Sequence, residues 1–188
     1  MTLRELSARL VVVVGASGSG KDSVMAGWLA GLPERVRPRR ARRTITRPAH
    51  VQSEDHEPVS GPRFDALLER GAFAFHWSAH GLRYGVRHDE LAPLLDGRWV
   101  VVSGSRAHLP ELLQAAPRAW IVEVDAPAGL RAGRLLDRGR EADDAVAARL
   151  CRELEPVRAD LRILNDGPLE AAVATLDAWW RGLAETPR

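Results

Sequence analysis

Short continuous runs of apolar residues alternate along the chain with segments in which apolar residues recur every three or four positions. The runs at 10–14, 99–102, 120–124 and 161–164 have the length and composition of buried strands. An amphipathic helical segment closes the chain, with its apolar positions at Leu169, Ala172, Val173, Leu176, Trp180 and Leu183. Together with a candidate strand at 39–46, the alternation predicts an α/β fold, with a parallel five-stranded core sheet flanked by helices.

One polar, β-containing stretch interrupts this alternation and predicts an inserted region within a single domain. It contains a short helix pattern at 62–70 and two strand patterns that pair around a turn, at 73–77 and 82–86. The predicted organisation is one domain over residues 1–188, with its core at 9–44 and 97–188, the insert at about 45–90 and a short lid at about 134–149.

The first apolar run leads into a glycine-rich loop that ends at a lysine. The loop fits the pattern G-x-x-x-x-G-K of phosphate-binding loops, with Gly15, Ala16, Ser17, Gly18, Ser19, Gly20 and Lys21. A strand before the loop and a helix after it would place backbone N–H groups and the positive end of the helix dipole around an anion. Lys21 is the only lysine, whereas every other one of the 27 Lys+Arg residues is an arginine. We therefore predict that the loop binds a nucleoside triphosphate.

The residue after the lysine departs from the usual loop. That position normally carries Ser or Thr, whose hydroxyl reaches Mg²⁺, but here it is Asp22, and Ser23 follows. A carboxylate is a good ligand for Mg²⁺, and it also favours a helix N-terminus by its charge alone. The two roles are compatible. No strand ends in an evident metal-binding aspartate, which makes a metal role for Asp22 more attractive.

Composition and charge narrow the class of partner. The formal net charge is only +2 over 188 residues, and aromatic residues do not interleave with the arginines, so nucleic acid is not an expected partner. No stretch reaches the roughly 18 apolar residues of a membrane span, and the first nine residues lack the pattern of a signal peptide. A single cysteine, Cys151, fits a reducing compartment. We expect a cytoplasmic protein with a small-molecule substrate; a homodimer is left open.

The arginines form two clusters that suit phosphoryl transfer, because a guanidinium grips phosphate oxygens with two hydrogen bonds. The first cluster leads into the insert and includes Arg43 and Arg47, and the second includes Arg134, Arg138 and Arg140, with Arg149 nearby. Any one of these side chains can equally be a solvated surface charge.

The order of these features resembles the guanylate kinase group of P-loop kinases over nearly the whole chain. The matching segments are Thr44-Ile45-Thr46-Arg47-Pro48, Gly71-Ala72-Phe73, Gly81-Leu82-Arg83-Tyr84-Gly85, Arg134 to Gly139, Arg149-Leu150 and Asn165-Asp166. The resemblance implies that Arg47 and Tyr84 hold the acceptor phosphate, that Arg138 and Arg149 stabilise the transferred group, and that Asn165 and Asp166 lie near the adenine. A guanine-reading glutamate of that group is replaced by Ser78.

Further segments are similar to the ribose 1,5-bisphosphate phosphokinase family. They include the loop ending Gly-Lys-Asp-Ser, Ser-Glu-Asp-His-Glu-Pro-Val-Ser, Phe-His-Trp-Ser-Ala-His-Gly-Leu-Arg-Tyr-Gly and Gly-Ser-Arg-Ala-His-Leu-Pro. Members of that family also carry Asp after the loop lysine. The resemblance implies that ATP phosphorylates ribose 1,5-bisphosphate to 5-phosphoribosyl 1-diphosphate, in phosphonate breakdown.

The expected site follows from these motifs. Residues 15–23, Arg134, Asn165 and Asp166 are expected to hold ATP, with Mg²⁺ near Asp22 or Ser23. Catalytic roles are expected for Lys21, Arg138 and Arg149, and substrate binding for Arg43, Arg47, Tyr84, Ser103 and Arg106. The alternatives are a nucleoside monophosphate kinase like guanylate kinase, a small-molecule kinase of another P-loop branch, and a non-catalytic guanylate-kinase-like binding module.

Overall fold

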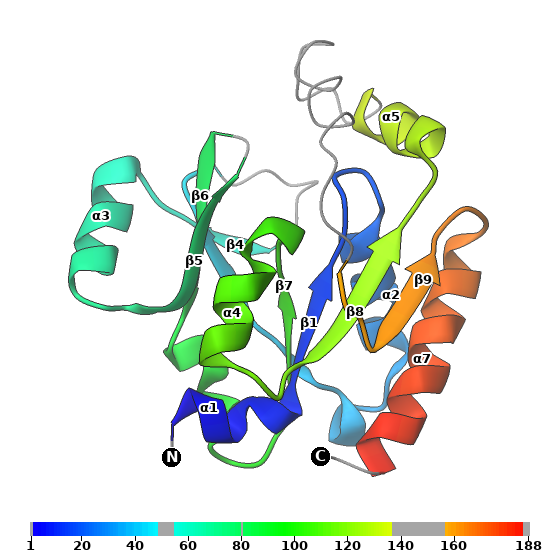
Figure 1. Cartoon of the computed structure of the whole chain (residues 1–188), viewed down its shortest axis with the longest axis horizontal. Coiled ribbons are helices and arrows are strands. Elements are labelled where there is room, and N and C mark those ends of the chain that lie inside the picture. The colour runs from blue at the N-terminus through cyan, green and yellow to red at the C-terminus, as the bar shows by residue number, and fades with distance from the viewer. Residues whose placement is uncertain (1, 49–54, 80, 137–156, 186–188) are drawn as a thin grey trace.

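The core of the protein is a parallel five-stranded sheet with the strand order β2-β7-β1-β8-β9. The computed structural model describes residues 2–48, 55–79, 81–136 and 157–185. The strands are β1 (Leu10–Val14), β2 (Arg39–Arg40), β7 (Val100–Ser103), β8 (Trp120–Asp125) and β9 (Leu161–Leu164). Figure 1 shows this sheet in the middle of the molecule, with β1 beside β8. The predicted fold class is therefore confirmed.

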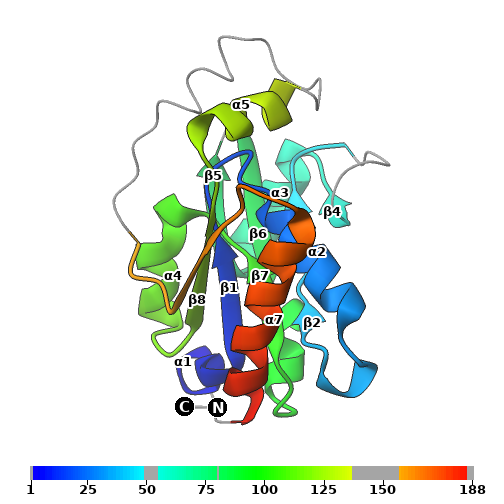
Figure 2. The ribbon, with the colours of Figure 1, turned by 90° about the vertical axis from the view of Figure 1, so that its right-hand side faces the viewer.

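Helices cover both faces of this sheet, because the apolar residues of its strands point alternately to either side. One face packs against α2 (Lys21–Gly31) and α7 (Leu169–Glu185). The other face packs against α4 (Leu109–Ala115) and the short N-terminal helix α1 (Leu3–Leu6). In Figure 2, β1 and β8 lie between α4 on one side and α2 with α7 on the other. No helix in the described part of the chain is long and apolar enough to cross a membrane.

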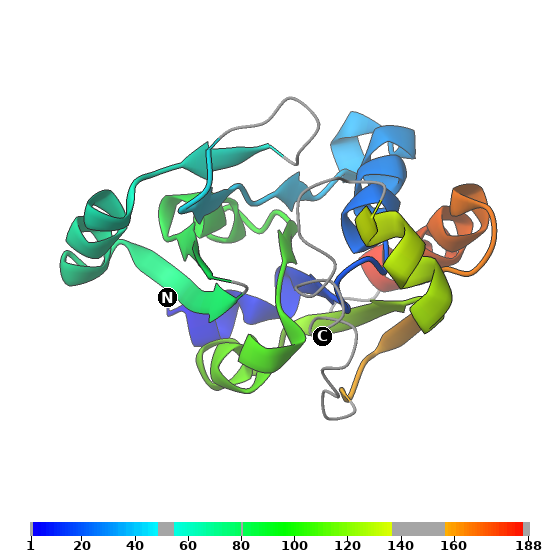
Figure 3. The ribbon, with the colours of Figure 1, turned by 90° about the horizontal axis from the view of Figure 1, so that it is seen from above.

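A second, four-stranded sheet lies beside the core, with the order β4-β3-β6-β5. Its strands are β3 (Arg43–Ile45), β4 (His56–Pro58), β5 (Phe73–Ala79) and β6 (Leu82–Arg87), and α3 (Gly61–Glu69) packs on it through Phe64 and Phe73. Figure 3 shows this unit on the opposite side of the molecule from α7. Short 3₁₀ helices at Ser7–Arg9, Glu34–Val36, Asp89–Leu94 and Arg106–His108, and α5 (Ala128–Leu136), complete the described elements.

The predicted strand at 39–46 is in fact two short strands that belong to different sheets. The backbone N–H of Ala41 still bonds to Val101 of the core sheet, but the N–H of Arg42 bonds to the Glu90 carboxylate at 2.9 Å. After that side-chain bond the chain leaves the core sheet and pairs with β4 and β6 as β3. The segment thus links the core directly to the second sheet.

Tryptophans fix α7 to the rest of the core. The Trp180 ring lies edge-on to the rings of Trp28 on α2 and of Trp99, with 5.4 Å and 5.0 Å between the ring centres. Trp180 is only 2% exposed. Such T-shaped pairs add to the free energy gained by burying the rings.

We expect Trp180→Ala to lower the free energy of unfolding by about 3–5 kcal/mol, because it removes a fully buried indole and leaves a cavity between α2, α7 and the sheet. Urea unfolding followed by circular dichroism measures the loss. The matched control is Trp179→Ala. The Trp179 ring is partly buried, with its centre 6.1 Å from that of Trp120, and its removal should lower the free energy of unfolding clearly less. Equal losses would contradict this account of the core.

Candidate active site

The glycine loop is held close against the end of β8 and the loop after β9. A side chain at Gly15 would place its Cβ 2.2 Å from the carbonyl oxygen of Val124, and at Gly20 it would lie 2.4 Å from Nδ2 of Asn165. Gly20 also has φ +83°, a left-handed conformation that favours glycine. The two glycines therefore allow the backbone to wrap closely just before α2 begins at Lys21.

Two of the predicted nucleotide-binding residues brace this loop from the opposite side. Nδ2 of Asn165 donates to the carbonyl oxygen of Ser19 at 2.8 Å, and Arg134 donates to the same oxygen at 3.4 Å and to the Asn165 carbonyl at 3.2 Å. These bonds turn the Ser19 carbonyl toward the protein. The Ser19 amide bonds to the Ala16 carbonyl within the loop, and the remaining loop amides are the ones that could meet an anion. The hydroxyl of Ser19 is buried and has no hydrogen-bond partner among the described residues.

Lys21 and Asp22 form an ion pair at the mouth of the loop. Nζ of Lys21 lies 2.8 Å from Oδ2 of Asp22, and the Ser103 hydroxyl donates to Oδ1 at 2.8 Å. Burial acts to raise the pKa of the Asp22 carboxyl, but the charges of Lys21 and Arg43 and the bonds from Lys21 and Ser103 outweigh it, so this pKa lies well below its ordinary value. Asp22 is thus a carboxylate at neutral pH.

Arginines of the linking segment surround the same carboxylate. Arg40 on β2 approaches Oδ1 of Asp22 at 3.9 Å, and Arg43 on β3 donates to the Ser103 carbonyl at 3.3 Å. Arg43 is only 7% exposed, so its charge acts in a poorly hydrated setting where it attracts anions strongly. The sequence analysis predicted Arg43 at the site but did not single out Arg40.

An aromatic stack extends from Arg43 along the second sheet. The guanidinium carbon of Arg43 lies 5.3 Å from the centre of the Tyr84 ring. The Trp77 ring stacks on Tyr84 on one side and on His108 on the other, with 5.4 Å between ring centres in both pairs. Burial lowers the pKa of His108 despite the opposing charge of Glu111, so its imidazole is neutral at pH 7. The stacking of Trp77 on Tyr84 and on His108 was not predicted, because only the tertiary fold brings these residues together.

The alternation along β5 bears on the argument from Ser78. Phe75 and Trp77 are buried on one face, whereas Ser78 is exposed and points to the other. A register shift between Phe73 and Phe75 turns Phe73 instead against Phe64 of α3. The loss of a base-reading carboxylate therefore cannot be argued from Ser78. What the buried face of β5 presents instead is entirely aromatic.

Arg106 is brought to the same edge of the sheet but is already paired. Its guanidinium lies 3.4 Å from Oε1 of Glu123 on β8, and Arg162 lies 3.4 Å from Oε2 of the same carboxylate. Glu123, which is buried, stands next to Val14 in the parallel register. Strand periodicity could have indicated it, as a charged residue within the apolar run at 120–124.

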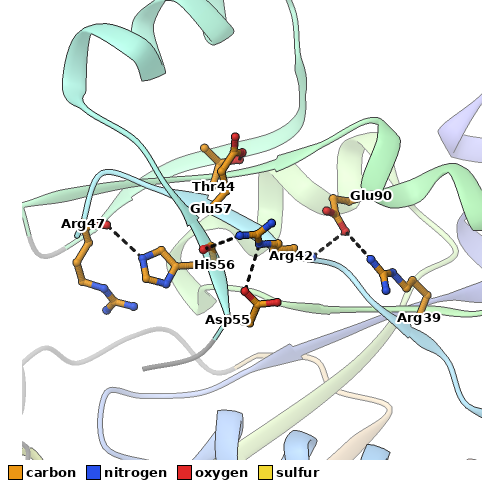
Figure 4. A network of polar contacts seen from close by, with 8 residues as sticks. All are labelled: Arg39, Arg42, Thr44, Arg47, Asp55, His56, Glu57 and Glu90. Atoms are coloured by element: carbon orange, nitrogen blue, oxygen red, sulfur yellow. Dashed lines mark hydrogen bonds and ion pairs between the residues drawn. The ribbon is translucent and has the colours of Figure 1, made fainter. Parts of the chain in front are cut away.

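A polar network fixes the segment that carries Arg47 (Figure 4). Nε2 of the buried His56 lies 3.2 Å from the Arg47 carbonyl oxygen, which can only accept, so this nitrogen carries the proton. Arg42 contacts Asp55 at 3.3 Å and the His56 carbonyl at 3.2 Å. Further contacts in Figure 4 involve Glu90 with Arg39, and Thr44 with Glu57.

The predicted site residues thus fall into four groups. The loop, Lys21, Asp22, Arg43, Tyr84, Ser103, Arg134 and Asn165 are linked by the contacts above, and Arg106 and Arg47 are held in neighbouring networks. Ser23 and Asp166 are exposed, and among the described residues no side-chain contact joins them to the loop. Arg138 and Arg149, with most of the predicted lid, lie outside the described residues.

A strand, a glycine loop and a helix at the end of a parallel sheet, with a lysine in the loop and arginines around it, define a P-loop kinase. The fold is that of guanylate kinase: the enzyme from Anaplasma phagocytophilum superposes with a TM-score of 0.72 at 16% identity, over 96% of this chain and 88% of that one. No family model matches the chain.

Relatives of known name are much closer in sequence. The chain is 42% identical to ribose 1,5-bisphosphate phosphokinase PhnN of Burkholderia mallei, over 95% of this chain and 98% of that protein. It is 44% identical to the protein of the same name from Acidiphilium cryptum, over 89% and 90%. The chain therefore belongs to the ribose 1,5-bisphosphate phosphokinase family. A bifunctional ribose 1,5-bisphosphokinase-thymidine phosphorylase of Azorhizobium caulinodans is 43% identical over 86% of the chain, which matches 24% of that longer protein.

The close contact at Gly20 leads to a test of the loop. Gly20→Ala should cost at least about 1–2 kcal/mol in unfolding free energy, because an alanine in the left-handed region is strained and its Cβ meets Asn165. It should also weaken ATP binding, measured by calorimetry.

Gly31→Ala, at the other end of α2, is the matched control. A Cβ at Gly31 meets nothing within 4 Å, so this change should be neutral or stabilise the helix by up to about 1 kcal/mol. If both variants behaved alike, the constraint at Gly20 would be refuted.

Proposed function

We propose that the protein transfers the γ-phosphoryl group of ATP to the 1-phosphate of ribose 1,5-bisphosphate. An oxygen of that phosphate bonds to the γ-phosphorus while the bond to ADP breaks, which yields 5-phosphoribosyl 1-diphosphate. The acceptor oxygen is already an anion, so the reaction needs no strong general base. The observation that carries this proposal is the match to relatives of that name over nearly their full length.

The donor half of the site fits ATP. The glycine loop and the N-terminus of α2 would receive the phosphates, and Lys21 would leave Asp22 to bridge their oxygens. Arg134 and Asn165 would act by keeping the loop in shape, since their described contacts are to its carbonyl groups.

Asp22 fits a magnesium ion bound with the nucleotide. It is an ionised oxygen ligand within hydrogen-bond distance of Lys21, and Mg²⁺ commonly binds one or two carboxylates together with substrate phosphates. When bound, Mg²⁺ neutralises charge that develops on the β- and γ-phosphates. Ser23, the other predicted ligand, is exposed and is the weaker candidate.

The acceptor half would be formed by the arginines and the tyrosine of the linking segment and second sheet. Arg43 and Tyr84 lie beside the carbonyl of Ser103, next to Asp22, so a phosphate held there would be close to the transferred group. Arg47 and Arg106 would hold the remaining charge of a substrate with two phosphates. Arg138 and Arg149 keep their expected role in neutralising the moving phosphoryl group.

The aromatic stack favours a sugar bisphosphate over a nucleoside monophosphate as acceptor. Trp77 and His108 occupy the space behind Tyr84, and no carboxylate on the buried face of β5 could accept from a guanine. The lysine and arginines argue against a non-catalytic binding module. A cytoplasmic location fits the single cysteine, and association into a homodimer stays a prediction.

The direct test is phosphoryl transfer from Mg-ATP to each acceptor, followed by ³¹P NMR of the products. Ribose 1,5-bisphosphate should give a new diphosphate signal, whereas GMP should give little or none. Efficient turnover of GMP without turnover of the sugar bisphosphate would refute the proposal.

Lys21→Ala should reduce transfer by a factor of about 10² or more, since one charge aimed at the transition state contributes on that scale, while circular dichroism stays unchanged. Arg181→Ala removes a cation from the exposed face of α7, where it pairs with Asp177, and should leave the rate unaltered. Full activity of the Lys21 variant would exclude the loop as the donor site.

A further inference from the structure

The contact between Asp22 and Ser103 joins the two positions at which P-loop enzymes usually hold their metal ion. In those enzymes the residue after the loop lysine supplies a hydroxyl, and an aspartate from a strand supplies a carboxylate. Here the residue after the lysine is the carboxylate of Asp22, and the strand β7, which pairs with β1, ends at the hydroxyl of Ser103. The same two groups are present, but each stands in the other's place.

The backbone fixes both groups in position. Ser103 pairs with Val13 in the parallel register, two residues before the glycine loop begins, and it is 2% exposed. Asp22 lies in the first turn of α2, directly after the loop. Because β7 pairs with β1, which leads into the loop, and α2 follows the loop, the 2.8 Å hydrogen bond between Ser103 and Asp22 is set by the same geometry that shapes the loop.

The two carboxylate oxygens of Asp22 have different partners. Oδ1 accepts from Ser103 and faces Arg40, whereas within the described part of the chain Oδ2 accepts only from Lys21. The serine hydroxyl has one proton, and by donating it to Oδ1 it orients the carboxylate. If Lys21 turns to bound phosphates, Oδ2 is the oxygen that becomes free.

We propose that the hydroxyl and the carboxylate have been exchanged between α2 and β7: Asp22 supplies the carboxylate for the nucleotide's magnesium ion, and Ser103 positions it. This inference rests on the proposed function. Within the described part of the chain, no group of three or more His, Cys, Asp or Glu side chains could hold a metal ion. One positioned carboxylate, completed by phosphates and water, is consistent with the way Mg²⁺ binds in kinases.

The exchange predicts that Asp22→Ser weakens metal binding, although this change restores the residue that phosphate-binding loops usually carry after the lysine. Asp22→Ser restores the usual Lys-Ser pair, so it should be harmless if Asp22 merely favours the helix N-terminus. If the two groups are exchanged, Asp22→Ser removes the carboxylate of the Asp22–Ser103 pair, so it must weaken metal binding. Ser103→Asp in the same molecule would rebuild the pair in its usual orientation and should recover most of the loss.

Metal binding can be measured without turnover, by the electron paramagnetic resonance of Mn²⁺ added to the protein with a non-hydrolysable ATP analogue. We expect Asp22→Ser and Asp22→Asn to weaken Mn²⁺ binding by at least tenfold, and Ser103→Ala, which removes only the orienting bond, to weaken it by about 10- to 100-fold. Asp22→Ser with Ser103→Asp should bind clearly better than Asp22→Ser alone. Asp177→Ser, which removes an ion-paired carboxylate on α7, is the control.

Each outcome decides one of the two claims. If Asp22→Ser or Asp22→Asn binds Mn²⁺ as tightly as the wild-type protein, the exchange is overturned while the proposed function stands. A double variant that folds, by circular dichroism, but binds no better than Asp22→Ser also overturns it. If the wild-type protein binds neither ATP analogue nor metal, the proposed function falls, and the exchange falls with it.

Discussion

The parallel pairing of β1 with both β7 and β8 is the constraint on which the site depends. It places Val13 beside Ser103 and Val14 beside Glu123, so the two neighbouring strands deliver polar side chains exactly where the apolar strand turns into the loop. Side chains alternate along a strand, so Ser103 points toward α2 and bonds Asp22, while Glu123 points to the opposite face and holds Arg106. A shift of one residue in the pairing with β7 would turn Ser103 to the opposite face, and the same shift in the pairing with β8 would turn Glu123.

Cationic side chains gather around one carboxylate at the mouth of the loop. Burial acts to raise the pKa of Asp22, but the charges of Lys21 and Arg43 and the hydrogen bonds from Lys21 and Ser103 outweigh it and hold this pKa down. Arg40 also approaches the same carboxylate. Buried guanidinium groups are costly unless anions or carbonyl oxygens meet them. Arg43 has the Ser103 carbonyl and the face of Tyr84, and a phosphate would be a far better partner. The same physics explains why Lys21, with its compact and mobile ammonium, serves the loop, whereas rigid arginines line the acceptor side.

Much of the fold was predictable because its signals are local. The apolar runs at 10–14, 120–124 and 161–164 became β1, β8 and β9, and the glycine pattern located the loop. The strand predicted at 39–46 was wrong as one element, because Glu90, far away in sequence, captures the backbone of Arg42. Loop residues could be named from spacing, but Arg40, Glu123 and the partner of Asp22 depend on which strands become neighbours. That information is held in the packing of the whole sheet.

The acceptor side shows how a local argument can reach a sound conclusion for the wrong reason. Ser78 was taken to replace a base-reading carboxylate, yet it lies on the exposed face of β5. Discrimination against a base must come from the buried face, where Trp77 lies flat between Tyr84 and a neutral His108. The stacked rings of Trp77, Tyr84 and His108 carry no carboxylate that could accept from the N–H groups of a guanine, and a site without those polar groups gains little from binding one. Two phosphates, by contrast, require only cations, and cations are what the neighbouring segment provides.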